Sequence, residues 1–176
     1  MNKILLIYAS KTGTTQDAAT EVAWLIAMPC DIYNCSNELL QKDGLTQERI
    51  RPDQLNWDSY GMVVIGTAMY MRSPMKEINV LCKKYQQKLK QKKLVFFTCG
   101  IETEAEDKAY LWKQLPEEVS RAILLYRHLG GEIRQDRMKA FSRFIMREYV
   151  KQNNPATGID HTAVKELSSE IVKLMK

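Results

Sequence analysis

Residues 3–28, KILLIYASKTGTTQDAATEVAWLIAM, contain an apolar run, a hydroxyl-rich segment and an amphipathic segment in direct succession. The run at 3–8, KILLIY, is short and aliphatic, which is typical of a buried strand. From Gly13 to Met28 the apolar residues recur at helical spacing, and Pro29 ends this pattern. A buried strand that leads through a short loop into a helix predicts the first unit of a parallel α/β sheet.

The rest of the chain repeats this alternation. Residues 31–35, DIYNC, form a weak strand pattern, and GMVVIGTAM at 61–69 is strongly apolar and β-branched. KLVFFTCG at 93–100 is a further strand, and GGEIR at 130–134 is a candidate fifth strand. We therefore predict one domain over residues 1–176, an α/β fold with a five-stranded doubly wound parallel sheet and helices on both faces. Helices are expected at 13–28, 75–91, 105–129 with a break at Pro116, 136–151 and 160–175.

The segment SKTGTT at residues 10–15 packs four hydroxyl side chains and one glycine after the first strand. Ligands of open parallel sheets bind beyond the carboxyl ends of the strands, and a helix N-terminus favours an anion there. Gly13 lets the backbone approach a phosphate closely, although the segment matches neither a P-loop nor a dinucleotide motif. We predict a site for a terminal phosphate, with a simple helix cap by Thr12 or Thr14 as the alternative. The hydroxyls that can donate to a phosphate belong to Ser10, Thr12, Thr14 and Thr15.

The composition is that of a globular protein with a basic balance. The 176 residues are 45% hydrophobic and 27% charged, with a formal net charge of +5. No apolar run approaches the roughly 20 residues of a membrane-spanning helix, and the N-terminus lacks a signal-peptide pattern. The four cysteines match no zinc or redox spacing, so we expect reduced structural thiols. We predict a cytoplasmic protein without a metal site or a nucleic-acid partner, whose charge suits an acidic partner or surface.

Three segments of the chain resemble the flavodoxin family. SKTGTT resembles the family's phosphate loop, and WDSYGMVVIGTAMYMRSP at 57–74 resembles its third strand and the loop that follows. LVFFTCGI at 94–101 fits the strand before the second flavin loop. The resemblance spans nearly the whole chain and implies a flavodoxin-like three-layer sandwich that binds FMN. It implies that the phosphate of FMN is held by Ser10, Lys11, Thr12, Gly13, Thr14 and Thr15.

The resemblance also implies two loops that flank the flavin ring. Tyr70 is the aromatic residue of the ring-flanking loop at 67–70 and a candidate to cover one ring face. The alternatives are that Met69 or Met71 covers the ring, or that Tyr70 is simply a surface residue. The ring-flanking loop at 98–101 lacks the G-D-x-x-Y pattern of small electron carriers, which implies a more open flavin. Cys99 is expected either to touch the ring or to pack in the core. The implied ring-flanking residues are Thr67, Ala68, Met69 and Tyr70, and then Thr98, Cys99, Gly100 and Ile101.

A basic insert at about 135–159 separates this chain from small flavodoxins. LGGEIRQDRMKAFSRFIMREYVK at 129–151 resembles the corresponding region of menaquinone-dependent protoporphyrinogen oxidase, a flavodoxin-like enzyme of haem synthesis. This implies a porphyrinogen substrate and a quinone acceptor. On a helix, Arg143 and Arg147 lie one turn apart, suited to porphyrin carboxylates or to anionic lipid at the inner face of the membrane. The alternative is an amphipathic helix with a solvated basic face.

The predicted site contains no arrangement of nucleophile and base, so we assign no catalytic side chain. His128 and His161 are expected near helix ends, as surface or C-cap residues. We expect an FMN-dependent oxidoreductase in which the flavin supplies the chemistry and a redox partner protein or a quinone exchanges electrons with it. The alternatives are a soluble flavodoxin-type electron carrier or quinone reductase, and a flavin-free module that binds another phosphate ligand.

Overall fold

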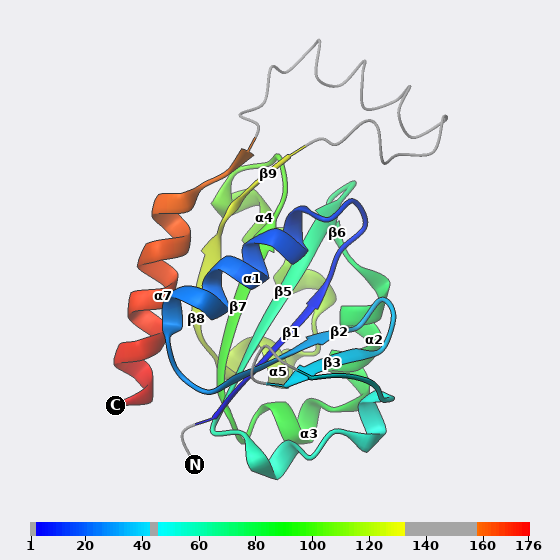
Figure 1. Cartoon of the computed structure of the whole chain (residues 1–176). Coiled ribbons are helices and arrows are strands. Elements are labelled where there is room, and N and C mark those ends of the chain that lie inside the picture. The colour runs from blue at the N-terminus through cyan, green and yellow to red at the C-terminus, as the bar shows by residue number, and fades with distance from the viewer. Residues whose placement is uncertain (1–2, 43–45, 133–157) are drawn as a thin grey trace.

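The computed structural model describes residues 3–42, 46–132 and 158–176. Within these ranges, eight strands form one sheet, and its main path runs β4-β3-β2-β1-β5-β7-β8 (Figure 1). Five neighbouring strands of this path are mutually parallel, which confirms the predicted doubly wound sheet. In order across the sheet these are β2 (Cys30–Asn34), β1 (Ile4–Ala9), β5 (Met62–Tyr70), β7 (Lys93–Cys99) and β8 (Ile123–His128).

The fifth parallel strand is β8, not the predicted strand at 130–134. The sequence prediction continued a helix to residue 129, whereas α4 (Glu104–Gln114) and α5 (Glu117–Ala122) end before the run ILLYRH of β8. A continuous apolar run has no periodicity that separates a buried helix from a strand, so the assignment failed there. Residues 130–131 form the short strand β9, which pairs antiparallel with β10 (Gly158–Ile159).

Antiparallel strands extend the sheet beyond the prediction. β3 (Leu39–Lys42) pairs with β2, and β4 (Thr46–Arg49) pairs with β3 at the edge. All four residues of β4 are exposed, so no apolar pattern marks them in the sequence. The two-residue strand β6 (Ser73–Pro74) folds back on the end of β5.

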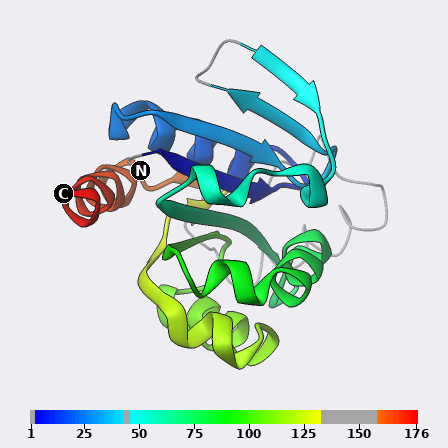
Figure 2. The same cartoon turned by 90° about the horizontal axis from the view of Figure 1, so that it is seen from below.

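Helices cover both faces of the sheet (Figure 2). α1 (Thr14–Ile26) and α7 (His161–Met175) lie on one face, and α7 confirms the predicted C-terminal helix. The predicted helix at 75–91 is divided at Tyr85, and the one at 136–151 lies outside the described residues. The opposite face is covered by α2 (Lys76–Lys84), α3 (Gln86–Leu89), α4 and α5, and two 3₁₀ turns span Pro52–Gln54 and Trp57–Ser59.

β1 is the centre of both hydrophobic cores. Leu5 and Ile7 point into the core beneath α2 to α5, whereas Ile4 and Leu6 point into the core beneath α1 and α7. All six residues of β1 are buried, because both faces of a parallel sheet are covered by helices. Complete burial of such a side chain contributes about 1.5 to 3 kcal/mol.

We predict that Leu6→Ala lowers the free energy of unfolding by about 2 to 5 kcal/mol, because it leaves a cavity between the sheet and α1. Urea denaturation followed by circular dichroism measures this change. Val80→Ala is the matched control, since Val80 is 53% exposed and its truncation is expected to change stability by less than about 0.5 kcal/mol. Equal losses for the two variants would contradict the central place of β1 in the core.

Candidate functional site

The carboxyl ends of β1, β5 and β7 meet at the upper end of the sheet in Figure 1. In the strand register, Ala9 faces Thr67 on β5, and Ala68 faces Cys99 on β7. Parallel pairing therefore brings together the three segments that the sequence predicted to be one site. In chain order we call them the first loop (10–15), the second loop (67–75) and the third loop (98–103).

The first loop turns sharply into α1. Gly13 has a φ of 100°, a left-handed conformation that residues with a Cβ rarely adopt. The Gly13 N–H donates to Ser10 Oγ at 3.0 Å, which closes the turn. Ser10 and Thr12 are half-buried, and Lys11 is exposed. The loop thus presents a tight backbone turn and polar side chains directly at the positive end of α1.

The next two hydroxyls point into the protein. Thr14 donates to the carbonyl oxygen of Glu132 at 3.4 Å, and Thr15 is fully buried. Thr15 Oγ1 has no hydrogen-bond partner of ordinary geometry among the described residues, although the Cys99 thiol lies beside it as a weak one. A buried hydroxyl without a full partner costs stability, so Thr15 is a polar exception among the mainly apolar buried residues of α1.

Thr67 holds the second loop. Its Oγ1 accepts the Met75 N–H at 2.9 Å, across the turn between β5 and β6. Met71 and Arg72 have positive φ angles of 50° and 62°, a conformation that is uncommon for residues other than glycine. Gln114 of α4 donates to the carbonyl of Arg72 at 3.1 Å, which fixes the strained turn. Such strain persists where the surroundings determine the backbone, as they do here.

Lys11 links the first loop to the second. Its Nζ lies 3.5 Å from the centroid of the Tyr70 ring, a cation–π contact. The sequence predicted Lys11 only as a member of the phosphate loop, because its contact with Tyr70 depends on how two loops distant in the chain face each other. Met69 is buried in the core, whereas Tyr70 is half-buried and Met71 is 71% exposed. Tyr70 and Met71 are therefore the better placed of the three candidates to cover a planar ligand.

The third loop is held by close backbone contact. A Cβ on Gly131 would lie 2.3 Å from the carbonyl oxygen of Gly100, so β9 can approach this loop only with a glycine. The Gly100 N–H donates to the carbonyl of Gly130 at 3.1 Å. Burial raises the pKa of the Cys99 thiol to about 12, which keeps it protonated near neutral pH. Cys99 is thus an uncharged packing residue in this structure, and Ile101 is half-buried.

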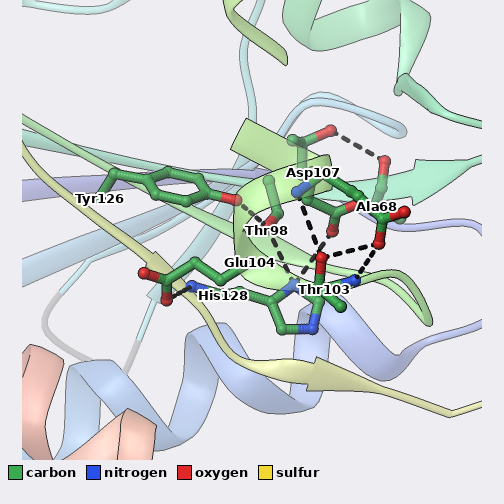
Figure 3. A network of polar contacts seen from close by, with 9 residues as sticks. Ala68, Thr98, Thr103, Glu104, Asp107, Tyr126 and His128 are labelled. Atoms are coloured by element: carbon green, nitrogen blue, oxygen red, sulfur yellow. Dashed lines mark hydrogen bonds and ion pairs between the residues drawn. The ribbon is translucent and has the colours of Figure 1, made fainter. Parts of the chain in front are cut away.

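A polar network that the sequence did not predict lies beneath the third loop (Figure 3). Thr98 Oγ1 lies 2.8 Å from the Tyr126 hydroxyl and 3.4 Å from His128 Nδ1. His128 Nδ1 in turn lies 3.0 Å from Asp107 Oδ2. His128 was expected near a helix end at the surface, but it ends β8 with a side chain only 14% exposed. Asp107 occurs in the acidic run ETEAED, which gives no signal of burial.

The flavodoxin domain family model matches residues 5–158. The chain belongs to this family. Among curated proteins, none matches the chain. The described residues contain no group of three or more side chains suited to bind a metal ion. None of the helices that they form is long and apolar enough to cross a membrane.

Solved structures of flavodoxins share the fold at low identity. Oxidised flavodoxin 1 from Bacillus cereus is 13% identical with a TM-score of 0.56, and the match covers 97% of each chain. A flavodoxin, WrbA-like protein from Agrobacterium tumefaciens is 14% identical with a TM-score of 0.53, over 99% of each chain. A Lactobacillus acidophilus flavoprotein in complex with FMN is 13% identical with a TM-score of 0.52, over 72% of this chain and 92% of that one.

We predict that Cys82 and Cys99 resist alkylation by iodoacetamide at about pH 8, because burial raises the pKa of each thiol to about 12 and the thiolate is the reactive form. Because both pKa values are raised, each thiol stays protonated at lower pH, and its modification should increase only as the pH approaches about 12. Peptide mass mapping measures it, with guanidinium-unfolded protein as the positive control. Rapid modification of Cys99 in the native protein would show that the third loop exposes a reactive thiol.

Proposed function

We propose that this chain binds FMN and acts as a flavodoxin-type electron-transfer protein. The observation that carries the proposal is the first loop, which ends β1, begins α1 and lies in register with the two loops after β5 and β7. The fold-related L. acidophilus flavoprotein, solved in complex with FMN, supports it. When bound, the flavin supplies the electron transfer, while the protein binds and orients it.

The donors of the first loop suit a single phosphate. Residues Ser10–Thr15 would hold it through backbone N–H groups at the start of α1 and through hydroxyls. The left-handed turn at Gly13, which lets the backbone approach an anion closely, fits a polar group there. Since Lys11 places its ammonium on Tyr70, the loop in this conformation relies on neutral donors, as expected for a phosphate held without a basic side chain.

The second and third loops would hold the flavin ring. Tyr70 and Met71 are the candidates to cover one face, and the backbone of Ala68 and Gly100 would lie along the ring edge. The Thr67 and Thr98 hydroxyls serve the protein itself, because each already has a partner in the second loop or in the network beneath the third. We therefore assign these two threonines to positioning the loops.

A redox partner protein or a quinone would exchange electrons with the ring at this end of the sheet. The exposed Met71 and Arg72, whose side chain is 59% exposed, border the second loop and offer a contact surface of mixed apolar and positive character. The formal net charge of +5 favours a partner with an acidic surface. Electron transfer of this kind needs no catalytic side chain, so we assign none.

A more specific proposal than FMN-dependent electron transfer is that the chain oxidises protoporphyrinogen and passes the electrons to a quinone. It rests on the resemblance of residues 129–151, most of which lie outside the described structure. Arg143 and Arg147 would face porphyrin carboxylates or anionic lipid at the inner face of the membrane. The soluble electron carrier or quinone reductase stays the competing proposal.

We predict saturable binding of FMN, with the yellow absorption of a flavoprotein, and no binding of FAD, because the first loop suits one phosphate. Thr12→Ala with Thr14→Ala removes two hydroxyls of the first loop, and the Thr14 hydroxyl would have to exchange the carbonyl of Glu132 for the phosphate. A hydroxyl donated to a charged group is worth about 1.5 to 3 kcal/mol, so loss of one such bond lowers FMN affinity about tenfold or more and loss of both about a hundredfold or more. Riboflavin, which lacks the phosphate, should be little affected. Fluorescence titration measures both ligands.

Thr20→Ala is the matched control for this pair of substitutions. The Thr20 hydroxyl is exposed on α1 and bonds to the carbonyl of Gln16, away from the first loop. FMN affinity of this variant should equal that of the wild type. Failure of the wild type to bind micromolar FMN would leave the flavin-free phosphate-binding module, whereas equal losses for FMN and riboflavin would show that the loop acts through folding.

For the insert, we predict that Arg143→Glu with Arg147→Glu abolishes protoporphyrinogen oxidation with a menaquinone analogue but leaves FMN bound. Charge reversal repels the substrate carboxylates and does not alter the first loop. If the insert binds anionic lipid instead, vesicle co-sedimentation of the wild type should weaken sharply with salt, and the variant should lose it. Absence of both activities in the wild type would favour the soluble electron carrier.

A further inference from the structure

The carboxylate of Asp107 is buried beneath the third loop with a single described partner. Asp107 is 0% exposed, and its Oδ2 lies 3.0 Å from His128 Nδ1 (Figure 3). Its Oδ1 has no hydrogen-bond partner among the described residues. A buried carboxylate is costly unless a cation compensates its charge, and His128 is the group placed to do so.

The hydrogen-bond geometry identifies the proton that can exchange. A carboxylate only accepts, so Nδ1 of His128 donates to Asp107 whether the imidazole is charged or neutral. The proton that distinguishes the two states is therefore on Nε2, and the partly exposed ring gives it access to water. Loss of this proton leaves the charge of Asp107 uncompensated in the protein interior.

The remaining titratable neighbours do not replace this compensation. Burial raises the pKa of the Tyr126 phenol above its ordinary value, and that of the Cys99 thiol to about 12, so both stay uncharged at physiological pH. Glu104 of α4 is exposed and accepts the backbone N–H of His128 at 3.0 Å, which adds negative charge. The imidazole is thus the group in this cluster that can carry a positive charge.

The same pair supports the loops that would flank the flavin ring. A Cβ built on Gly100 would lie 2.8 Å from Asp107 Oδ2 and 3.1 Å from Met69 Cβ, so the carboxylate packs directly behind the second and third loops. Thr98 begins the third loop and contacts His128, and Thr103 ends it by capping α4 through Glu106. His128 also joins β8 to α4.

From these contacts we infer that Asp107 and His128 form a positioning pair that couples binding of the flavin ring to the protonation of His128. The inference rests on the proposed FMN function. With His128 protonated, the compensated pair holds the third loop in place. When His128 loses its Nε2 proton, the uncompensated carboxylate loosens the loop, and the ring binds more weakly.

Riboflavin is the probe, because it presents the ring without a phosphate whose own titration would obscure the profile. Its affinity is measured by fluorescence quenching from about pH 6 to about pH 9, with circular dichroism at each pH to verify folding. The wild type should lose about fivefold or more in affinity with rising pH. At every pH tested, His128→Gln should bind riboflavin with the affinity that the wild type has at high pH, because glutamine keeps a hydrogen bond but carries no charge.

Asp107→Asn combined with His128→Gln supplies the decisive comparison. The double variant contains no buried charge, so it should regain affinity relative to His128→Gln and show no pH dependence. A purely structural role predicts that the second substitution restores nothing. His161→Gln is the matched control, since His161 forms the same kind of pair with Glu21 at 2.9 Å on the exposed surface. Its pH profile should equal that of the wild type.

Nuclear magnetic resonance gives a readout that does not depend on affinity. The sequence contains two histidines, so the His161→Gln spectrum assigns the imidazole signals of His128. By reciprocity, riboflavin should shift the His128 titration to higher pH and leave that of His161 unchanged. An unchanged His128 titration, or the same pH profile in His128→Gln, would overturn the inference while flavin binding stands. Absence of flavin binding in the wild type would overturn both proposals.

Discussion

The parallel pairing of β1 with β2 on one side and β5 on the other is the constraint on which the rest of the molecule depends. Each residue of β1 is buried in one of two cores, so the strand can shift neither along nor across the sheet without exposing apolar side chains. Because parallel strands all end at the same edge, this register also delivers the first, second and third loops to one place.

The loops at that edge are ordered by interactions with the protein interior. The Thr67 hydroxyl holds the turn after β5, and the glycine pair at 100 and 131 lets β9 pack on the third loop. Positive φ angles at Met71 and Arg72 store backbone strain in the same region. Preorganisation of this kind lowers the entropy that a ligand must overcome, which suits a site that holds a planar cofactor between two loops.

Charge is distributed unevenly around this edge. Lys11 of the first loop contacts the ring of Tyr70 in the second loop. The segment proposed to hold the phosphate and the segment proposed to cover the flavin ring therefore contact each other in this structure. Beneath the third loop, a carboxylate and an imidazole lie close together in a setting with little water, where electrostatic interactions are strong. One side of the site thus presents neutral donors, and the other contains a buried carboxylate beside an imidazole.

The sequence by itself determined the strand–loop–helix unit at residues 3–28, the doubly wound parallel sheet and the position of the first loop, because hydrophobic period and turn residues are local signals. It misplaced the fifth parallel strand, since the apolar run at 123–126 has no period that separates strand from helix, and it gave no sign of the exposed edge strand β4. Only the tertiary structure brought Lys11 to Tyr70 and Asp107 to His128. Burial of a charged residue depends on contacts between segments distant in the chain, and no local pattern encodes them.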